Sequence, residues 1–154
     1  MNKILFVCHG NICRSPMAEW VMKTLVKEAH VEHLFEIDSA ATSREEIGNP
    51  IYPPAQRCLY AHGIRGAHHE ARQVTAADYD HYDHIILMDH NNLRNIRRII
   101  PSDPDGKICL LMSLVGKDRD VADPWYTGDF EATYSDVLEG CRKLLEMISG
   151  HQNK

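Results

Sequence analysis

Residues 3–16 decide the fold, and they read KILFVCHGNICRSP. The first six of them form a short apolar run, which is typical of a strand buried on both faces. A polar loop follows, and Ser15 with Pro16 then predicts a helix start, with serine as the N-cap and proline at the first helical position. We expect this helix to continue to about Ala29, because apolar residues repeat within it at four-residue spacing.

The rest of the chain alternates short apolar runs with longer amphipathic stretches. Strands are expected at residues 34–39, 84–88 and 107–112, and helices at residues 54–62, at residues 91–100 and from Phe130 towards the C-terminus. Because helices separate successive strands, the strands should pair in parallel. The sequence therefore predicts an α/β fold, a three-layer open sheet of about four parallel strands with helices on both faces.

Composition narrows the class of protein. The chain has 154 residues, no internal repeat and no linker long enough to divide it, so we expect a single domain over residues 1–154. The 17 basic and 22 acidic residues leave a formal net charge of -5, which argues against a partner that is nucleic acid or an anionic membrane. Residues 1–30 carry four basic and two acidic side chains, so an anion site is expected near the N-terminus.

The cysteines and the hydropathy pattern indicate the compartment. No run of residues fits a membrane span or a signal peptide. The five cysteines are odd in number and scattered, unlike the disulfide framework of a secreted domain. We therefore expect a cytoplasmic protein with mostly free thiols. Cys58, Cys109 and Cys141 fall in predicted core elements and are expected to be unreactive.

The loop after the first strand has the composition of an anion site. Where a loop wraps into a helix N-terminus, backbone N–H groups and the helix dipole point at one place, which suits a tetrahedral dianion. Gly10 should allow unusual dihedrals and a close approach, and the Arg14 guanidinium can hold two phosphate oxygens at once. The same positive field favours the thiolate of Cys8 as a nucleophile. The predicted phosphate-binding loop consists of His9, Gly10, Asn11, Ile12, Cys13, Arg14 and Ser15.

A phosphoryl transfer to a thiolate also needs a proton for the leaving oxygen, and a carboxylic acid on a nearby loop can supply it. Asp123 is the candidate, because the following proline stiffens the backbone there. Trp125 and Tyr126 can form one wall of a slot for a flat ring. The other Asp-Pro pair, at residues 103–104, is expected to be an ordinary turn.

The chain resembles the low-molecular-weight protein tyrosine phosphatases over nearly its whole length. The resemblance rests on residues 7–19, DSAATS (38–43), IGNP (47–50), ARQ (71–73), MD (88–89) and DPWY (123–126). It implies hydrolysis of phosphotyrosine in a substrate protein through a phosphocysteine intermediate, without a cofactor. In that reaction Cys8 is the nucleophile, Arg14 clamps the phosphate and the transition state, and Asp123 is the general acid and then the general base.

The resemblance also implies a buried polar network that supports the loop. The matching residues are Asn11, Ser15, Ser39 and a histidine. His69 is preferred over His68 as this histidine, because a short run to an arginine follows it, and Asp89 is its expected partner. The Ser15 hydroxyl is expected to help the Cys8 sulfur leave as a thiolate.

Two further residues bear on regulation and on substrate choice. The resemblance implies that Cys13 can form a reversible disulfide with Cys8 under peroxide, which would prevent overoxidation. Glu45 stands on the substrate rim where the family commonly carries an aromatic residue. It can favour basic or small substrates over acidic peptides, or it can simply face solvent.

Two other functions stay open. Protein arginine phosphatases resemble this chain closely but tend to have threonine where Ile12 stands, so Ile12 favours phosphotyrosine. A non-catalytic anion- or metal-binding regulator is the alternative from another class. The chain has no C-x-x-C or H-x3-H pair, and we therefore expect no metal site. The sequence does not indicate an oligomeric state.

Overall fold

The central sheet of the computed structural model, which describes residues 1–152, has four strands. They are β1 (Asn2–Cys8), β2 (Phe35–Ala41), β3 (His84–Leu87) and β4 (Ile108–Leu110). Neighbouring strands pair in parallel, in the order β2-β1-β3-β4. The predicted parallel α/β fold is thus confirmed. The single domain expected over residues 1–154 includes two residues that lie outside the described part.

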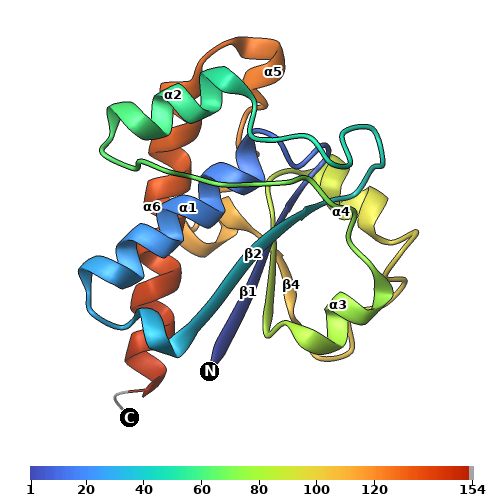
Figure 1. The fold of residues 1–154 in the computed structure, drawn as a ribbon. Coiled ribbons are helices and arrows are strands. Elements are labelled where there is room, and N and C mark those ends of the chain that lie inside the picture. Colours follow the sequence, from blue (N-terminus) through green and yellow to red (C-terminus); the bar gives the residue numbers. More distant parts are fainter. Residues whose placement is uncertain (153–154) are drawn as a thin grey trace.

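Helices cover both faces of the sheet (Figure 1). One face carries α1 (Arg14–Glu28), α2 (Pro53–Ala61) and α6 (Phe130–Gln152), and the other carries α3 (Ala76–His81) and α4 (His90–Ile96). Side chains of β1 alternate between the two cores: Ile4, Phe6 and Cys8 pack on the first side, and Leu5 and Val7 on the second. This two-sided burial explains why the strand is apolar without alternation.

Some elements differ from the expected ones. The strand expected at residues 107–112 ends at Leu110, because Leu111 begins the 3-10 helix η2 (Leu111–Val115). Leu111 is buried against α6, where Gly140 has no side chain to obstruct it. α4 ends at Ile96, earlier than expected. Three short helices were not predicted from the sequence: α3, α5 (Pro124–Thr127) and η1 (Glu32–Leu34).

The start of α1 was also predicted incorrectly. The helix begins at Arg14, and Cys13 rather than Ser15 occupies the N-cap position. Pro16 is consequently the third helical residue and not the first. The physical reason is that the Ser15 hydroxyl bonds to Cys8 and Asn11 inside the loop, so it does not cap the helix.

The topology places the loop after β1 at a crevice. The chain leaves β1 for β2 on one side and later returns to β3 on the other, so β1 lies where the strand order reverses. At such points the loops beyond the carboxyl ends of the strands diverge and leave room for a ligand. The loop of residues 9–13 and α5 both lie at this end of the sheet (Figure 1).

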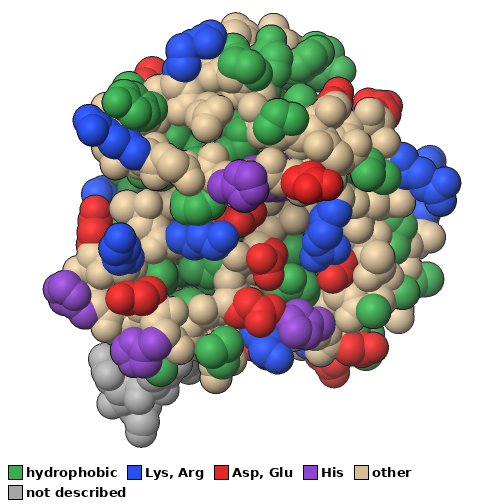
Figure 2. All heavy atoms as spheres, in the orientation of Figure 1, with side chains coloured by type: hydrophobic (Ala, Val, Ile, Leu, Met, Phe, Trp, Pro, Cys, Tyr) green, Lys and Arg blue, Asp and Glu red, His purple; other side chains and the backbone are tan. Residues whose placement is uncertain are grey.

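The surface is mixed in charge. Figure 2 shows basic and acidic side chains interspersed over the face that it displays, and neither sign gathers into a broad patch there. Within residues 1–152, every helix is too short or too polar to cross a membrane.

Candidate active site

A cavity of about 220 Å³ opens at the carboxyl end of β1. Its walls come from the loop after β1, from the segment that follows β2 and from the start of α5. The lining residues are Cys8, His9, Gly10, Asn11, Ile12, Cys13, Arg14, Glu45, Glu46, Asp123, Trp125 and Tyr126. The structure thus brings together the candidate nucleophile, the candidate anion clamp, the candidate acid and the expected rim residues.

The Cys8 sulfur sits at the base of this cavity and accepts hydrogen bonds from the loop. The backbone N–H of Asn11 donates to Cys8 Sγ at 3.3 Å, and Ser15 Oγ lies 2.9 Å from the same sulfur. Asn11 Nδ2 donates to Ser15 Oγ at 2.8 Å, which leaves the serine's own proton to point at Cys8. Donors aimed at a sulfur stabilise its thiolate form, as a nucleophile or a leaving group requires.

The backbone strain in this loop falls on Asn11 rather than on Gly10. Asn11 has a φ of 61°, in the left-handed region, so the expectation that Gly10 supplies the unusual dihedral is wrong. Asparagine tolerates this region better than other residues with a side chain. Its amide is held on three sides: Nδ2 donates to Ser15 and to Ser39 at 2.9 Å, and Oδ1 accepts the Arg72 N–H at 3.2 Å. These bonds hold the loop in its wrapped shape.

A second layer of polar contacts surrounds Asn11. His69 Nε2 donates to the Asn11 carbonyl at 2.6 Å, so of the two neighbouring histidines it is His69 that contacts the loop. Ser39 donates to Glu19 Oε1 at 2.6 Å, and His69 Nδ1 lies 3.8 Å from the same carboxylate. Burial lowers the pKa of His69, which favours the neutral ring in this position. Glu19 is a member of the network that the sequence analysis missed.

Asp89 is not the partner of His69, contrary to the prediction. It orients Arg14: the NH1 group donates to Asp89 Oδ2 at 2.7 Å and to the Val121 carbonyl at 2.8 Å. The other Asp89 oxygen caps α4 by accepting the Asn92 N–H at 2.7 Å. Burial by itself would lower the pKa of Arg14, but the negative charge of Cys8, Asp89 and Asp123 raises it on balance. The guanidinium is buried and keeps its charge.

Asp123 faces Arg14 from the opposite wall. It is the N-cap of α5, and its Oδ1 accepts the Trp125 N–H at 3.0 Å. The other oxygen lies 3.5 Å from Arg14 NH2, and the side chain is 28% exposed. The proline after it occupies the first helical position, where its ring fits without strain. The carboxyl group therefore has one oxygen anchored and the other turned to the cavity.

The aromatic wall has a support that the sequence analysis missed. The Trp125 ring packs against Tyr52, with centroids 4.8 Å apart, and Tyr52 also packs against Phe130 at 6.1 Å. Tyr126 is 85% exposed beside them. Tyr52 immediately precedes α2, and nothing in the sequence around it indicates that it contacts aromatic residues more than 70 positions later. Its role could therefore not be predicted from the sequence.

Part of the rim is acidic. Glu45 is exposed and its carboxylate lies 3.1 Å from His9 Nε2. Glu46, which the sequence analysis did not single out, also lines the cavity and accepts a hydrogen bond from Asn49. Two carboxylates thus make this part of the rim negatively charged.

Cys13 lines the same cavity as Cys8 and is buried. Burial, Cys8 and Asp123 raise the pKa of the Cys13 thiol to about 12, so it stays protonated at neutral pH. All five cysteines lie within the described residues and are free thiols. The expected disulfide between Cys13 and Cys8 stays a prediction.

The Arg72 guanidinium ties the supporting segment to α3. It donates to both carboxylate oxygens of Asp78, at 2.9 and 3.1 Å, while its backbone N–H holds Asn11. Gln73 pairs with the end of β2 through a bridge to Ala41. Residues 71–73, the ARQ motif on which the family resemblance partly rests, therefore support the loop that holds Asn11.

Outside the cavity, three side chains that can ligate a metal lie close together: Cys58, His62 and Glu131. No metal site was expected from the sequence. The overlooked signal was the spacing of Cys58 and His62, four residues apart in a predicted helix and therefore on one face of it.

Comparisons with known proteins agree with this geometry. The sequence model described as low molecular weight phosphotyrosine protein phosphatase matches residues 3–154. The low molecular weight phosphotyrosine protein phosphatase of Gallus gallus is 42% identical over 153 residues, which cover 95% of each chain.

Solved structures are also similar. The crystal structure of YfkJ from Bacillus subtilis has a TM-score of 0.92 and 39% identity, and the match covers 98% of this chain and 96% of that one. A Drosophila arginine phosphatase has a TM-score of 0.85 and 34% identity, covering 95% and 97%. Because the family model and the relatives match nearly the entire chain, this protein belongs to the low molecular weight phosphotyrosine protein phosphatase family.

Proposed function

We propose that the protein hydrolyses phosphotyrosine in substrate proteins, with Cys8 as the nucleophile, Arg14 as the phosphate clamp and Asp123 as the general acid and base. One observation carries the proposal: the thiol, the guanidinium and the carboxyl group line a single cavity. The residues around them hold each group in the orientation that the reaction needs. No cofactor takes part in the proposed steps.

Arg14 is prepared to bind two phosphate oxygens. Both NH1 hydrogens are already used, on Asp89 and on the Val121 carbonyl, so the Nε–H and NH2 donors remain for the substrate. A planar pair of donors matches two phosphate oxygens. The loop N–H groups and the N-terminus of α1 supply further positive field for the remaining oxygens.

In the first step the Cys8 thiolate attacks phosphorus. The S–P bond forms while the bond from phosphorus to the tyrosine oxygen breaks, and Asp123 gives its proton to that oxygen. The Trp125 N–H holds one oxygen of Asp123, and the other oxygen, 3.5 Å from Arg14 NH2, is the one placed to deliver this proton. The products of this step are tyrosine and a phosphocysteine.

In the second step Asp123, now a carboxylate, takes a proton from water. The water oxygen attacks phosphorus, the S–P bond breaks, and inorganic phosphate is released. The leaving group is the Cys8 thiolate, which the Ser15 hydroxyl and the Asn11 N–H stabilise. A donor aimed at developing charge typically contributes about 2.7–4 kcal/mol to such a step.

The rim suggests which phosphotyrosine peptides fit. Trp125 and Tyr126 offer apolar surface on one side, and Glu45 and Glu46 offer negative charge on the other. We expect peptides with basic residues next to phosphotyrosine to be preferred over acidic ones. Glu45→Lys should change the ratio of the two kcat/KM values by up to about fivefold, since an exposed charge contributes about 1 kcal/mol or less. An unchanged ratio would show that Glu45 only faces solvent.

The proposed partner is therefore a phosphotyrosine protein, and neither nucleic acid nor a membrane takes part. We place the reaction in the cytoplasm, where reducing conditions keep a reactive thiol free. The five free cysteines support this location.

A phosphoarginine substrate is the second candidate, because a similar structure is that of an arginine phosphatase. Ile12 lines the cavity here and presents only methyl and methylene groups. It has no hydroxyl with which to recognise the nitrogen of a phosphoramidate. The apolar side chain instead suits an aromatic ring, which favours phosphotyrosine.

Steady-state kinetics with matched phosphotyrosine and phosphoarginine peptides test the proposal. We expect a higher kcat/KM for phosphotyrosine, complete loss of turnover in Cys8→Ser, and normal turnover in Cys109→Ser, a control cysteine on β4 outside the cavity. Higher kcat/KM for phosphoarginine would transfer the function to the second candidate. Absence of turnover with any aryl phosphate would favour a non-catalytic anion-binding protein.

A further inference from the structure

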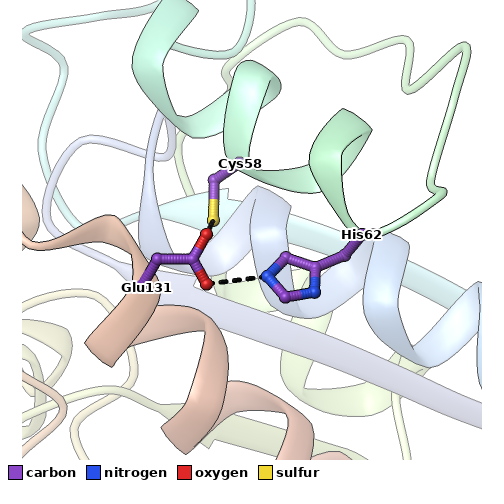
Figure 3. Close-up of side chains that lie close together, drawn as sticks. All are labelled: Cys58, His62 and Glu131. Atoms are coloured by element: carbon purple, nitrogen blue, oxygen red, sulfur yellow. Dashed lines mark hydrogen bonds and ion pairs between the residues drawn. The ribbon is translucent and has the colours of Figure 1, made fainter.

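A second group of reactive side chains lies at the interface of α2 and α6. Cys58 lies in α2, His62 is the residue that caps the end of this helix one turn later, and Glu131 is the second residue of α6. Figure 3 shows the side chains of Cys58 and His62 pointing towards the Glu131 carboxylate. Their sulfur, nitrogen and oxygen ligand atoms all lie within 4.8 Å of one another. The proposed phosphatase reaction uses none of these residues.

Two of the contacts can be compared with the ligand separations in a tetrahedral metal site. Zinc bonds of about 2.3 Å to sulfur and about 2.0 Å to nitrogen or oxygen place the ligand atoms about 3.3–3.6 Å apart. Cys58 Sγ lies 3.6 Å from Glu131 Oε1, which fits directly. His62 Nε2 lies 2.7 Å from Glu131 Oε2, the length of a hydrogen bond. Because the Glu131 side chain is 66% exposed, it can turn so that one of its oxygens coordinates an ion together with the other two side chains.

Two of the three donors are held in place by the fold. Cys58 is only 7% exposed, within the core that α2 shares with α1 and α6. The His62 ring is stacked on Tyr134, with centroids 3.7 Å apart and planes 10° from parallel. This stacking keeps Nε2 directed at Glu131. Little ordering is therefore needed on binding, which favours affinity.

We propose that Cys58, His62 and Glu131 bind a divalent ion of the zinc class, with water as the fourth ligand. A thiolate and an imidazole suit Zn²⁺, whereas Mg²⁺ and Ca²⁺ prefer sites made entirely of oxygen. Three protein ligands with one open position are a common zinc arrangement. The thiolate and the carboxylate together neutralise the two charges of the ion.

Binding must release protons, because only deprotonated ligands coordinate. The Cys58 thiol gives its proton to solvent as the sulfur–metal bond forms. His62 binds through the lone pair of Nε2, so any proton on that nitrogen is lost or moves to Nδ1 by tautomerisation. No electron transfer takes place.

The ion would join α2 to the start of α6 behind the segment that carries Asp123. Phe130, next to Glu131, packs against Tyr52, which in turn packs against Trp125. The site is nevertheless separate from the catalytic cavity, since none of its three ligands lines that cavity. Metal binding can therefore be tested without catalysis.

The test is a cobalt and zinc titration of the full chain in the Cys8→Ser background, which removes the active-site thiol. We expect one equivalent of Co²⁺ to bind with a thiolate-to-cobalt absorption band, and Zn²⁺ to displace it. Cys58→Ser and His62→Gln should abolish the band. Glu131→Gln should weaken binding by about tenfold or more, because even residues that only hydrogen-bond to a metal ligand can change the affinity by this factor.

Matched controls separate this site from incidental binding. Cys109→Ser removes a cysteine elsewhere, and His81→Gln removes a histidine that also pairs with a carboxylate, Glu36. Both should leave the titration unchanged. Zn²⁺ at about 100 times its Kd should raise the Tm of the Cys8→Ser protein by about 5–10 °C, and not that of the His62→Gln variant. Absence of the band in Cys8→Ser, or its survival in Cys58→Ser, would overturn the proposal.

Discussion

The ion pair between Arg14 and Asp89 offers the most informative test of the site. Replacing Asp89 by alanine removes two contacts at once: the 2.7 Å bond from Arg14 NH1 and the cap on α4 through the Asn92 N–H. Replacing Asp89 by asparagine separates the effect of the Arg14 contact from that of the helix cap. An asparagine keeps one oxygen to cap the helix and places an amide NH₂ towards Arg14, where two donors repel.

The contacts around Arg14 and Asp89 set the expected loss in the free energy of unfolding. Removing one partner of a buried pair typically costs about 3–5 kcal/mol. Arg14 retains the Val121 carbonyl and the nearby Asp123, so we expect the lower figure of about 2 kcal/mol that is usual for a hydrogen bond to a charged group. Loss of the cap adds about 1 kcal/mol. Asp89→Ala should thus lower the free energy of unfolding by about 3 kcal/mol and Asp89→Asn by about 2.

Catalysis should respond differently from stability. Both variants leave the Arg14 guanidinium without its orienting carboxylate, and a displacement of about 1 Å can reduce the rate by about 10²-fold. We therefore expect a similar fall in kcat/KM for both, together with weaker inhibition by inorganic phosphate. Urea unfolding gives the stabilities, and kinetics on a phosphotyrosine peptide give the rates.

A surface pair serves as the control for this experiment. Glu139→Gln removes the partner of Lys117, which it contacts at 2.9 Å with both side chains more than 40% exposed. It should change stability by about 1 kcal/mol or less and leave kcat/KM unchanged. If Asp89→Asn keeps the kcat/KM of the unaltered protein, then Asp89 does not orient Arg14 for catalysis.

Three further predictions follow from the same contacts. Asp123→Asn should reduce kcat by about 10²–10⁴-fold while inorganic phosphate still binds; equal losses in both would rule out a general acid. Cys13→Ala should lose activity irreversibly under peroxide, whereas a reductant should restore the unaltered protein; identical recovery would exclude a protective disulfide. Burial lowers the pKa of His69 below its unfolded value, so the unfolded chain binds more protons and stability falls as pH drops below about 6.5. His69→Gln should flatten this dependence in urea unfolding from pH 7.5 to 5, and an unchanged slope would contradict it.

Much of the fold could be predicted from local sequence patterns. The apolar run of β1 predicted a doubly buried strand, and both cores do pack on it. The ends of elements were harder, because they depend on distant contacts. β4 stops at Leu110 since Leu111 finds space beside Gly140, which is 29 residues later in the sequence.

In the candidate site, too, local arrangements were predicted correctly and contacts between distant residues were not. Cys8, Asn11 and Arg14 lie within seven residues of one another, between a predicted strand and a predicted helix, and this context predicted that they surround one anion site. The partners of Arg14 are 75 and 107 residues away, and Asp89 was wrongly predicted to pair with the loop histidine. Glu19 and Tyr52 were missed for the same reason.

By itself, the sequence determined the parallel α/β fold, the loop that can hold a phosphate and the candidate nucleophile, clamp and acid. These follow from local periodicity and from residue types at short spacing. Only the tertiary structure decided which histidine contacts the loop, which carboxylate orients Arg14 and that Asn11 rather than Gly10 takes the left-handed conformation. The physical reason is that hydrogen bonds and charge pairs depend on distances between atoms, and only the packing of helices on the sheet sets those distances.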